Sequence, residues 1–328
     1  MTGYTGKTRI HDAIALLGPP SGSKGAFALR AIYGAVALAG LTLAACSSSQ
    51  APIPSQTHET QAGVRRASNP RYIYVTDAGL DKLFIYPAGV PSRTPRSISV
   101  PAHPHGVATD TNGNVYVASA EADEINVYNS GATTLEYTIS SGLDRPEAVI
   151  VDSAGDVYAA NPHDNTIVEY GPGRTTVEAT FHTLEEPFGG LATDSSGNLY
   201  VDVDDGTVEQ CSSPLVPCAI IPGVAGAGSF GGLAFVPGQL AVCGTGKINY
   251  FTFPGWSPGR QNVEYYGSGV IDRFMTSDSN GTLYIPFIAS GLLNPPPPAV
   301  VVVSAAFGVA PYTITADLKG PFGAAAGP

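Results

Sequence analysis

The chain alternates short hydrophobic runs with polar turns, and this alternation has a constant length. In one stretch the hydrophobic runs are residues 115–118, 125–128, 135–139 and 148–151. The runs are rich in β-branched or aromatic side chains, and clusters of Gly, Asp, Asn and Pro separate them. Short runs of this composition between turn-forming residues are typical of β-strands. The pattern therefore predicts four short strands joined by tight turns.

One turn of this pattern recurs along the chain as Asp-x-x-Gly-x-x-Tyr. Its four clear copies are spaced by 42, 42 and 84 residues, and the last spacing is twice the first. An aspartate that caps the turn and a glycine that adopts a positive φ both favour a hairpin. The four copies begin at Asp110, Asp152, Asp194 and Asp278.

Two further copies complete the series. A copy near Val236 is one residue shorter in its turn and has Ala241 or Val242 in place of the tyrosine. Counting back 42 residues from the first clear copy reaches Ser68, where the same frame fits. Six copies therefore extend from Ser68 to about Lys319. The tyrosines at the shared position are interpreted as packing between repeats; they are Tyr74, Tyr116, Tyr158, Tyr200 and Tyr284.

Repeats of this length with four strands each predict a β-propeller. A single blade cannot bury its own apolar faces, whereas six blades in a ring cover one another. The predicted fold is therefore all-β, a six-bladed propeller of four-stranded blades. Residues 318–325 resemble residues 184–191, which lead into an innermost strand. We expect this C-terminal segment to close the ring beside residues 71–75, with residues 63–64 as the alternative source of that strand.

The copies resemble the NHL and YVTN classes of propeller repeat. The resemblance covers about 250 residues. It rests on the Asp-x-x-Gly-Asn-x-Tyr-Val pattern and on the preceding Pro104-His105-Gly106-Val107. The Gly-His and Trp-Asp signatures of WD repeats are absent from the sequence. The resemblance implies a six- or seven-bladed ring that usually binds a partner or ligand and only sometimes catalyses a reaction.

The N-terminal segment is typical of an export signal. Residues 31–43 are largely apolar, carry no charge, follow Arg30 and are too short to cross a bilayer, which takes about 20 apolar residues. The sequence Leu43-Ala44-Ala45-Cys46 resembles a bacterial lipobox, which implies cleavage before Cys46 and lipidation of that residue. We therefore predict a signal peptide in residues 1–45, a flexible tether in residues 46–67 and the propeller in residues 68–328. The mature protein is then a membrane-anchored bacterial lipoprotein, periplasmic or on the cell surface.

Composition and charge narrow the classes of function. The chain has 39 Gly, 28 Pro and only 13% charged residues, which disfavours helical bundles and helical solenoids. Four of the 16 basic and one of the 27 acidic residues lie in residues 1–45, so the remainder carries a net charge of −14. Such a domain has no general attraction for nucleic acid or anionic lipid. Contact with the membrane is therefore expected only through the lipid.

The remaining cysteines predict one disulfide. Cys211 and Cys218 flank a Ser- and Pro-rich segment between two strand signals, and an oxidising compartment favours a bond between them. Cys243 lies within a strand signal and is interpreted as a small buried residue. The sequence contains no CxxC spacing of the kind that binds metals.

A register of residues just before the innermost strands predicts a ring around one mouth of the channel. Three positions of this ring carry an imidazole, a carboxylate and a guanidinium, and glycines at other positions are expected to leave space. One position earlier stand aromatic residues and an aspartate. A concave mouth with aromatic walls and a few polar groups is the usual form of a small-ligand site. The candidate ligand-binding residues are His105, Glu147, Arg273, Phe188, Phe230 and Asp272.

Two other segments invite a functional interpretation. Residues 202–206 resemble part of a calcium-binding loop, but the distant bidentate glutamate of such a loop is missing. Residues 290–298 form an insertion that ends in four prolines, which favours an extended surface segment and a possible docking feature for a partner.

These patterns lead to one functional hypothesis and one alternative. The first is a non-catalytic propeller that binds a protein, peptide or glycan at the mouth with His105, Glu147 and Arg273, with no cofactor. In the alternative, His105 and Glu147 hold a divalent metal and the protein is a metal-assisted hydrolase or lyase. No Gly-x-Ser-x-Gly elbow, P-loop or His-Glu-x-x-His motif occurs in the sequence. Nothing in the sequence therefore requires an enzyme.

Overall fold

The computed structural model divides the chain into two units, Met1–Glu59 and Thr60–Pro328. The described residues are 70–89, 94–226, 231–244, 246–259, 263–264, 270–272, 274–289, 297–304, 312–315 and 317–327, all of which lie in the second unit. The predicted signal peptide, the tether and Cys46 lie outside them, as do residues 290–296 of the proline-rich insertion.

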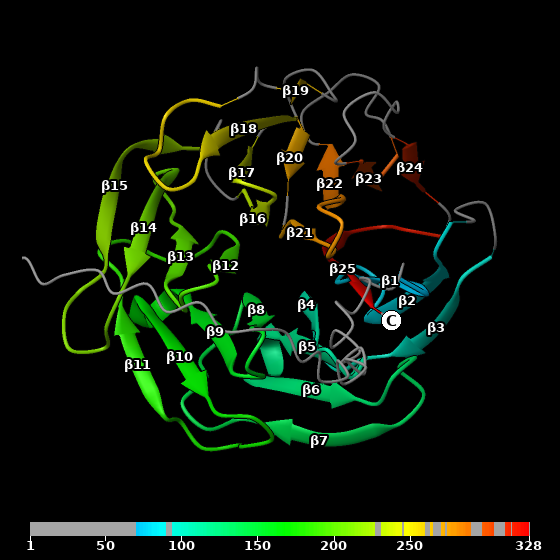
Figure 1. Cartoon of the computed structure of the whole chain (residues 1–328). Helices are drawn as coiled ribbons and strands as arrows, with labels where there is room; N and C mark the ends of the chain where they lie inside the picture. The colour runs from blue at the N-terminus through cyan, green and yellow to red at the C-terminus, as the bar shows by residue number, and fades with distance from the viewer. Residues whose placement is uncertain are drawn as a thin grey trace, which may run out of the picture. The chain divides into compact units, whose positions relative to one another are not determined.

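The second unit is a ring of six antiparallel β-sheets, with the innermost strand of each sheet at the centre of the ring (Figure 1). This arrangement confirms the predicted six-bladed β-propeller. The first three blades consist of β25 (Pro321–Gly327), β1 (Tyr72–Asp77), β2 (Lys82–Pro87) and β3 (Arg96–Ser99); of β4 (Pro104–Thr109), β5 (Val115–Ser119), β6 (Glu124–Tyr128) and β7 (Leu135–Ile139); and of β8 (Ala148–Val151), β9 (Val157–Asn161), β10 (Thr166–Tyr170) and β11 (Ala179–His182).

The other three blades follow the same order from the centre outwards. In the sixth blade two short segments, β20 and β21, both pair with β22 and together form the innermost strand. The strands are β12 (Leu191–Thr193), β13 (Leu199–Asp202), β14 (Thr207–Cys211) and β15 (Ala219–Ala225); β16 (Leu233–Val236), β17 (Gln239–Gly244), β18 (Lys247–Thr252) and β19 (Val263–Glu264); and β20 (Val270–Asp272), β21 (Thr276–Ser277), β22 (Leu283–Ala289), β23 (Ala299–Val303) and β24 (Tyr312–Ile314).

The repeated turn folds as its sequence predicts. In the second blade the Asp110 carboxylate accepts hydrogen bonds from the backbone amides of Asn112 and Asn114, at 2.9 and 2.8 Å. Gly113 has a φ of 85°, which favours glycine. The other carboxylate oxygen accepts a hydrogen bond from the Asn114 side chain. The motif therefore stabilises the hairpin between the innermost strand and the second strand of the blade.

The tyrosine register is buried between neighbouring blades. Tyr74 and Tyr200 are fully buried, and Tyr200 donates a hydrogen bond of 2.9 Å to Asp194 of its own repeat. In the fifth blade Ala241 takes this position, because it pairs with Ala234 as Tyr200 pairs with Ala192. The tyrosines are therefore core residues. Of the two alternatives for the fifth copy, the register selects Ala241 over Val242.

The C-terminal strand closes the ring. β25 pairs antiparallel with β1, with Tyr72 opposite Gly327 and Val75 opposite Ala324. Figure 1 shows the red β25 beside the blue β1, so the last strand of the chain lies beside the first. The prediction of a C-terminal closure is confirmed, and β25 occupies the place that the alternative gave to residues 63–64.

Glycines let the innermost strands approach one another closely. The Gly106 amide donates a hydrogen bond of 2.9 Å to the Glu147 carbonyl on the next blade. A Cβ at Gly106 would lie 2.8 Å from the Val149 backbone nitrogen, closer than real Cβ contacts allow. Gly190 makes the equivalent bond of 3.0 Å to the Gly231 carbonyl. A larger residue at Gly106 would therefore force these strands apart.

Candidate functional site

His105 and Glu147 meet at the mouth where the innermost strands begin. His105 is the second residue of β4, and Glu147 directly precedes β8 on the next blade. The His105 Nδ1 atom and a Glu147 carboxylate oxygen are within hydrogen-bond distance. Both side chains are buried, with 6% and 8% of each residue exposed. The structure therefore brings together two of the predicted site residues, which are 42 residues apart in the chain.

Residues of the first blade fix this pair in place. The Phe322 ring of β25 stacks on the His105 ring, with centroids 4.1 Å apart and planes 4° apart. The Thr76 hydroxyl donates a hydrogen bond to the His105 carbonyl and accepts one of 2.8 Å from the Gly323 amide. The closure of the ring thus also holds the imidazole.

Two partly exposed imidazole–carboxylate pairs lie on the same side of the ring. His103, just before β4, is 3.7 Å from Glu121 of the short 3-10 turn η1 (Ala120–Ala122). His163, in the 3-10 turn η2 (Pro162–Asp164), is 3.7 Å from Asp144. About half of each side chain is exposed. Solvent therefore reaches hydrogen-bonding groups on two neighbouring blades around the buried pair.

The ring glycines do not leave the space that the sequence suggested. A Cβ at Gly231 would lie 1.8 Å from the Cys243 carbonyl oxygen, and one at Gly323 would lie 2.6 Å from the His105 carbonyl oxygen. A Cβ at Gly189 would lie 2.5 Å from the Cβ of Asp202. This expectation was wrong because backbone and a neighbouring side chain fill the positions that a side chain would otherwise occupy.

Asp202 is the member of this mouth that sequence reasoning missed as a site residue. It is the last residue of β13, and none of it is exposed. Neither of its carboxylate oxygens has a hydrogen-bond partner in the part of the chain that the structure describes. Burial raises its pKa well above the usual range of an aspartate, and the nearby Gly231 amide offsets only part of that effect.

A signal for Asp202 was present in the repeat. Two residues after the shared tyrosine, the first three copies have Thr76, Ala118 and Ala160, whereas the fourth has Asp202. An acidic residue at a position that is small and uncharged in the other three copies indicates that this position has a different role in the fourth blade. In the sequence, Asp202 begins a run that resembles part of a calcium-binding loop without its distant glutamate, because the acidic residues Asp204 and Asp205 follow it directly. The strand, however, extends through Asp202 and buries its side chain.

Proteins of known structure share the fold of this chain. No family model matches the sequence, and no curated protein matches it. A chain of the nidogen–laminin complex is similar in structure, with a TM-score of 0.58, 17% identity, and 78% of this chain and 98% of that chain covered. A protein of unknown function from Bacteroides caccae has a TM-score of 0.62, 14% identity, and coverage of 79% and 99%. At these identities the likeness shows the propeller fold alone.

The other predicted mouth residues are described only in part. Arg273 and Phe230 lie outside the described residues, and only the backbone of Asp272 is described, in β20. Phe188 precedes β12 and is partly buried. Within the described residues no group of three or more His, Cys, Asp or Glu side chains could hold a metal ion. In the same part of the chain, no helix is long and apolar enough to cross a membrane.

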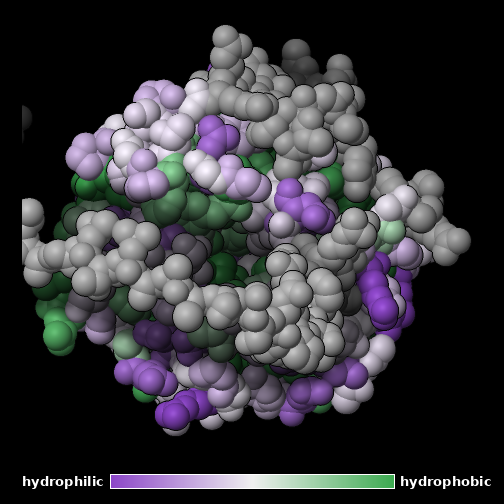
Figure 2. All heavy atoms as spheres, in the orientation of Figure 1, coloured by the Kyte–Doolittle hydropathy of each residue, from purple (hydrophilic) through white to green (hydrophobic). Residues whose placement is uncertain are grey.

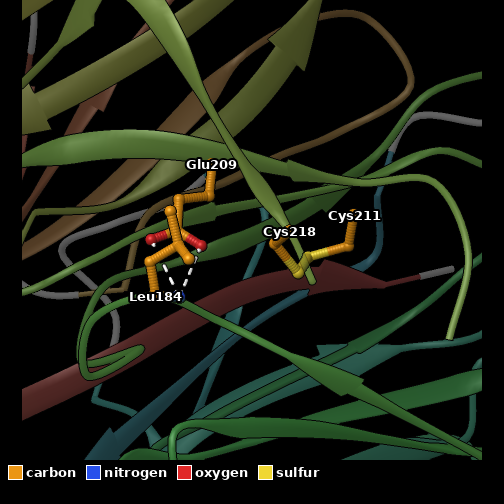
Figure 3. The surroundings of a disulfide bond; sticks show 4 residues. All are labelled: Leu184, Glu209, Cys211 and Cys218. Atoms are coloured by element: carbon orange, nitrogen blue, oxygen red, sulfur yellow. Dashed lines mark hydrogen bonds between the residues drawn. A yellow bond between two sulfur atoms is a disulfide. The ribbon is translucent and has the colours of Figure 1, made fainter. Parts of the chain in front are cut away.

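A disulfide joins two residues of the fourth blade. Cys211 ends β14 and is bonded to Cys218, seven residues later. Figure 3 shows the neighbouring Glu209 carboxylate, which accepts hydrogen bonds of 3.2 and 3.0 Å from the Leu184 amide. Burial raises the pKa of Glu209. Cys243 is buried, and its sulfur accepts a hydrogen bond of 3.1 Å from the Gly232 amide.

Proposed function

We propose that this protein is an exported propeller of the NHL/YVTN type that binds a protein, peptide or glycan partner at the mouth of His105 and Glu147. The predicted lipid on Cys46 holds it at a bacterial membrane, on the periplasmic or cell-surface side. Binding is non-catalytic in this proposal. The residues that contact the partner are those around the mouth, with the buried His105–Glu147 pair beneath them.

One observation carries the proposal. Three imidazole–carboxylate pairs lie at one mouth. The His105–Glu147 pair is buried, and the His103–Glu121 and His163–Asp144 pairs are about half exposed. Even with a charged imidazole, an exposed pair of this kind contributes only about 0–1 kcal/mol to stability, so stability gives little reason for the two exposed pairs to lie at this mouth. Their donors and acceptors are accessible and their backbone is fixed by the blades. This is the arrangement expected of a recognition surface on a rigid scaffold.

The fold itself is consistent with such a role. The similar chain of known structure belongs to a complex of nidogen with laminin, so a ring of this kind takes part in a protein assembly. That likeness supports binding of a protein in general. It does not choose among a protein, a peptide and a glycan for this chain.

Replacement of the exposed imidazoles is expected to weaken binding. The bait is the mature chain with Cys46→Ser, used to capture partners from an envelope extract of the native bacterium. The double variant His103→Ala, His163→Ala is expected to retain the captured species at least about tenfold less well, because each change removes an accessible hydrogen-bonding group. Retention is measured by quantitative mass spectrometry of the eluate.

The matched control is another exposed pair, on the third blade, which also carries His163. Arg174 and Glu178 form a pair of 3.9 Å between β10 and β11, and the double variant Arg174→Ala, Glu178→Ala is expected to capture as well as wild type. Equal capture by all three proteins, or equal loss in both variants, contradicts the proposal.

The membrane attachment is tested separately at Cys46. In cells, wild type is expected to fractionate with membranes and to label with a fatty-acid analogue, whereas Cys46→Ser is expected to be released as a soluble exported protein. A single acyl chain already gives measurable membrane affinity, so loss of the lipidated cysteine produces a large redistribution. A Cys46→Ser protein that still labels and still fractionates with membranes would refute the lipid anchor.

A further inference from the structure

The opposite end of the channel contains a cavity that the proposed function does not use. Its volume is about 190 Å³, and it is lined by the innermost strands of all six blades. The lining residues lie at the ends of these strands, such as Thr109 of β4 and Thr193 of β12. His105 lies four residues before Thr109 on the same strand, which corresponds to about 13 Å of extended chain. The cavity is therefore distinct from the His105–Glu147 mouth.

The described lining of the cavity carries hydroxyl groups and no charge. The hydroxyls belong to Thr109, Thr193, Thr276 and Ser277. Thr109 donates a hydrogen bond of 2.9 Å to the Ala326 carbonyl, and Ser277 donates one of 2.8 Å to the Phe235 carbonyl. Each of these oxygens keeps lone pairs that can accept a hydrogen bond from a ligand. The Thr193 hydroxyl makes no hydrogen bond within the described part of the chain, so it can both donate and accept.

An aromatic cluster adjoins the cavity. Phe235 of β16 lines the cavity, and its ring lies 5.2 Å from that of Phe253 between centroids. Phe253 in turn lies 5.3 Å from Trp256. All three rings are partly exposed. All three rings pack edge-on against the buried Tyr200, which fixes their positions. The part of each ring that stays exposed can contact a ligand that extends out of the cavity.

Figure 2 shows hydrophobic residues in the hollow at the centre of the ring, and hydrophilic residues mixed with some hydrophobic ones towards the rim. At the end of the channel that holds the cavity, the rim is acidic, because an aspartate of the repeated turn follows the innermost strand in four blades. Their carboxylates accept hydrogen bonds from their own turns. This rim disfavours anions, while the uncharged lining offers no partner for a buried cation. The four residues are Asp110, Asp152, Asp194 and Asp278.

We propose that this end of the channel binds the terminal sugar of a neutral oligosaccharide, with the hydroxyls of Thr193 and Ser277 bound to the sugar and the following sugar unit against Phe253 and Trp256. A hexose is uncharged, carries hydroxyls around its edge and has apolar faces, which matches the lining and the aromatic row. The cavity is smaller than the roughly 300–1,000 Å³ of drug-sized ligand sites, so it accepts one ring and leaves the rest of the chain outside.

The chain has a single tryptophan, which gives the test a local probe. The purified mature protein with Cys46→Ser is titrated with cellotriose, maltotriose and chitotriose while Trp256 fluorescence and saturation-transfer NMR are recorded. At least one of these neutral trisaccharides is expected to shift the emission and to show transfer to its terminal ring. Trigalacturonic acid and the fully deacetylated chitosan trimer are the anionic and cationic controls, and neither is expected to bind.

Variants then locate the bound sugar. Thr193→Val keeps the shape and removes the hydroxyl, and it is expected to weaken binding by about tenfold. Phe253→Ala, in a partly exposed loop, is the second variant, used in case Thr193→Val fails to fold. It is expected to weaken binding by a similar factor. Asp164→Asn, an exposed change in η2 at the other mouth, is expected to bind the trisaccharide as wild type does.

Four results would overturn the proposal. The first three are no binding of any neutral trisaccharide by either method, binding only of a charged trimer, and binding that Thr193→Val and Phe253→Ala leave unchanged. The fourth is loss of binding in Asp164→Asn alone, which would place the sugar at the other mouth.

Discussion

A chain that ends at Gly320 is expected to lose the cooperative unfolding transition of the whole propeller. The truncation removes β25, which supplies the innermost strand of the first blade and pairs with β1 along five registered positions. Ala324 and Ala325 of β25 are buried, so their removal also leaves a gap in the core of the ring. The two ends of the chain would then present open sheet edges to solvent, which favours aggregation.

The magnitude of this effect follows from the bonds that are lost. Each internal hydrogen bond contributes about 1 kcal/mol, and each buried group left unpaired costs about 1–3 kcal/mol. The Thr76 and Thr276 hydroxyls also lose partners in β25, namely the Gly323 amide and the Ala324 carbonyl. The sum of these losses is comparable with a total stability of about 5–15 kcal/mol, so we expect no stable ring to remain.

Thermal unfolding followed by near-ultraviolet circular dichroism, with size-exclusion chromatography at each step, measures this result. A synthetic peptide of residues 318–328 is expected to restore the transition when added to the truncated protein. The same peptide with Ala324→Asp is the control and is expected to fail, because it places a charge at a wholly buried position. A truncated protein with an unchanged transition would show that the closure is dispensable.

Asp202→Asn is expected to stabilise the folded protein by about 1–3 kcal/mol at pH 8. The carboxylate is fully buried, without a hydrogen-bond partner in the described residues, and its folded-state pKa is raised by that burial. An aspartate in the unfolded chain has a pKa of about 3.9. Between these two pKa values the folded state binds more protons than the unfolded state, so the free energy of unfolding falls as pH rises.

The difference in the free energy of unfolding between wild type and Asp202→Asn is therefore expected to be small at pH 4 and to grow towards pH 8. It is measured by urea denaturation at each pH. Asp204→Asn, an exposed change two residues away, is the control and is expected to leave stability within about 0.5 kcal/mol. Glu209 and Glu169 also have raised pKa values, so the free energy of unfolding of the variant still falls somewhat as pH rises. An asparagine protein that is no more stable than wild type at pH 8 contradicts this account.

Much of the fold could be predicted because the propeller repeats one local pattern. The strands predicted at residues 135–139 and 148–151 match β7 and β8 exactly in their bounds, since turn-forming residues limit both ends of each run. The pairing of His105 with Glu147 followed from their separation of one repeat, because equivalent positions in adjacent blades are neighbours in a ring. The disulfide between Cys211 and Cys218 followed from their positions on either side of a short turn.

The parts that the sequence did not predict depend on contacts between blades. The glycines at 189 and 231 could be read as open space, because a missing side chain looks the same in a sequence whether the position is empty or filled by a neighbour. Asp202 could be read as a solvated loop residue, because its burial depends on how closely the fifth blade approaches the fourth. The channel cavity with its hydroxyl lining depends on six strands at once.

The sequence by itself determined the strands, the turns, the number of blades and the C-terminal strand that closes them. These follow from the period of hydrophobic and polar positions and from the chemistry of the repeated Asp-x-x-Gly turn, which act within about 42 residues. Only the tertiary structure decided which polar groups are buried, which are paired and where space remains at the two mouths. Those properties follow from the distance between neighbouring blades, and that distance is set by packing around the whole ring.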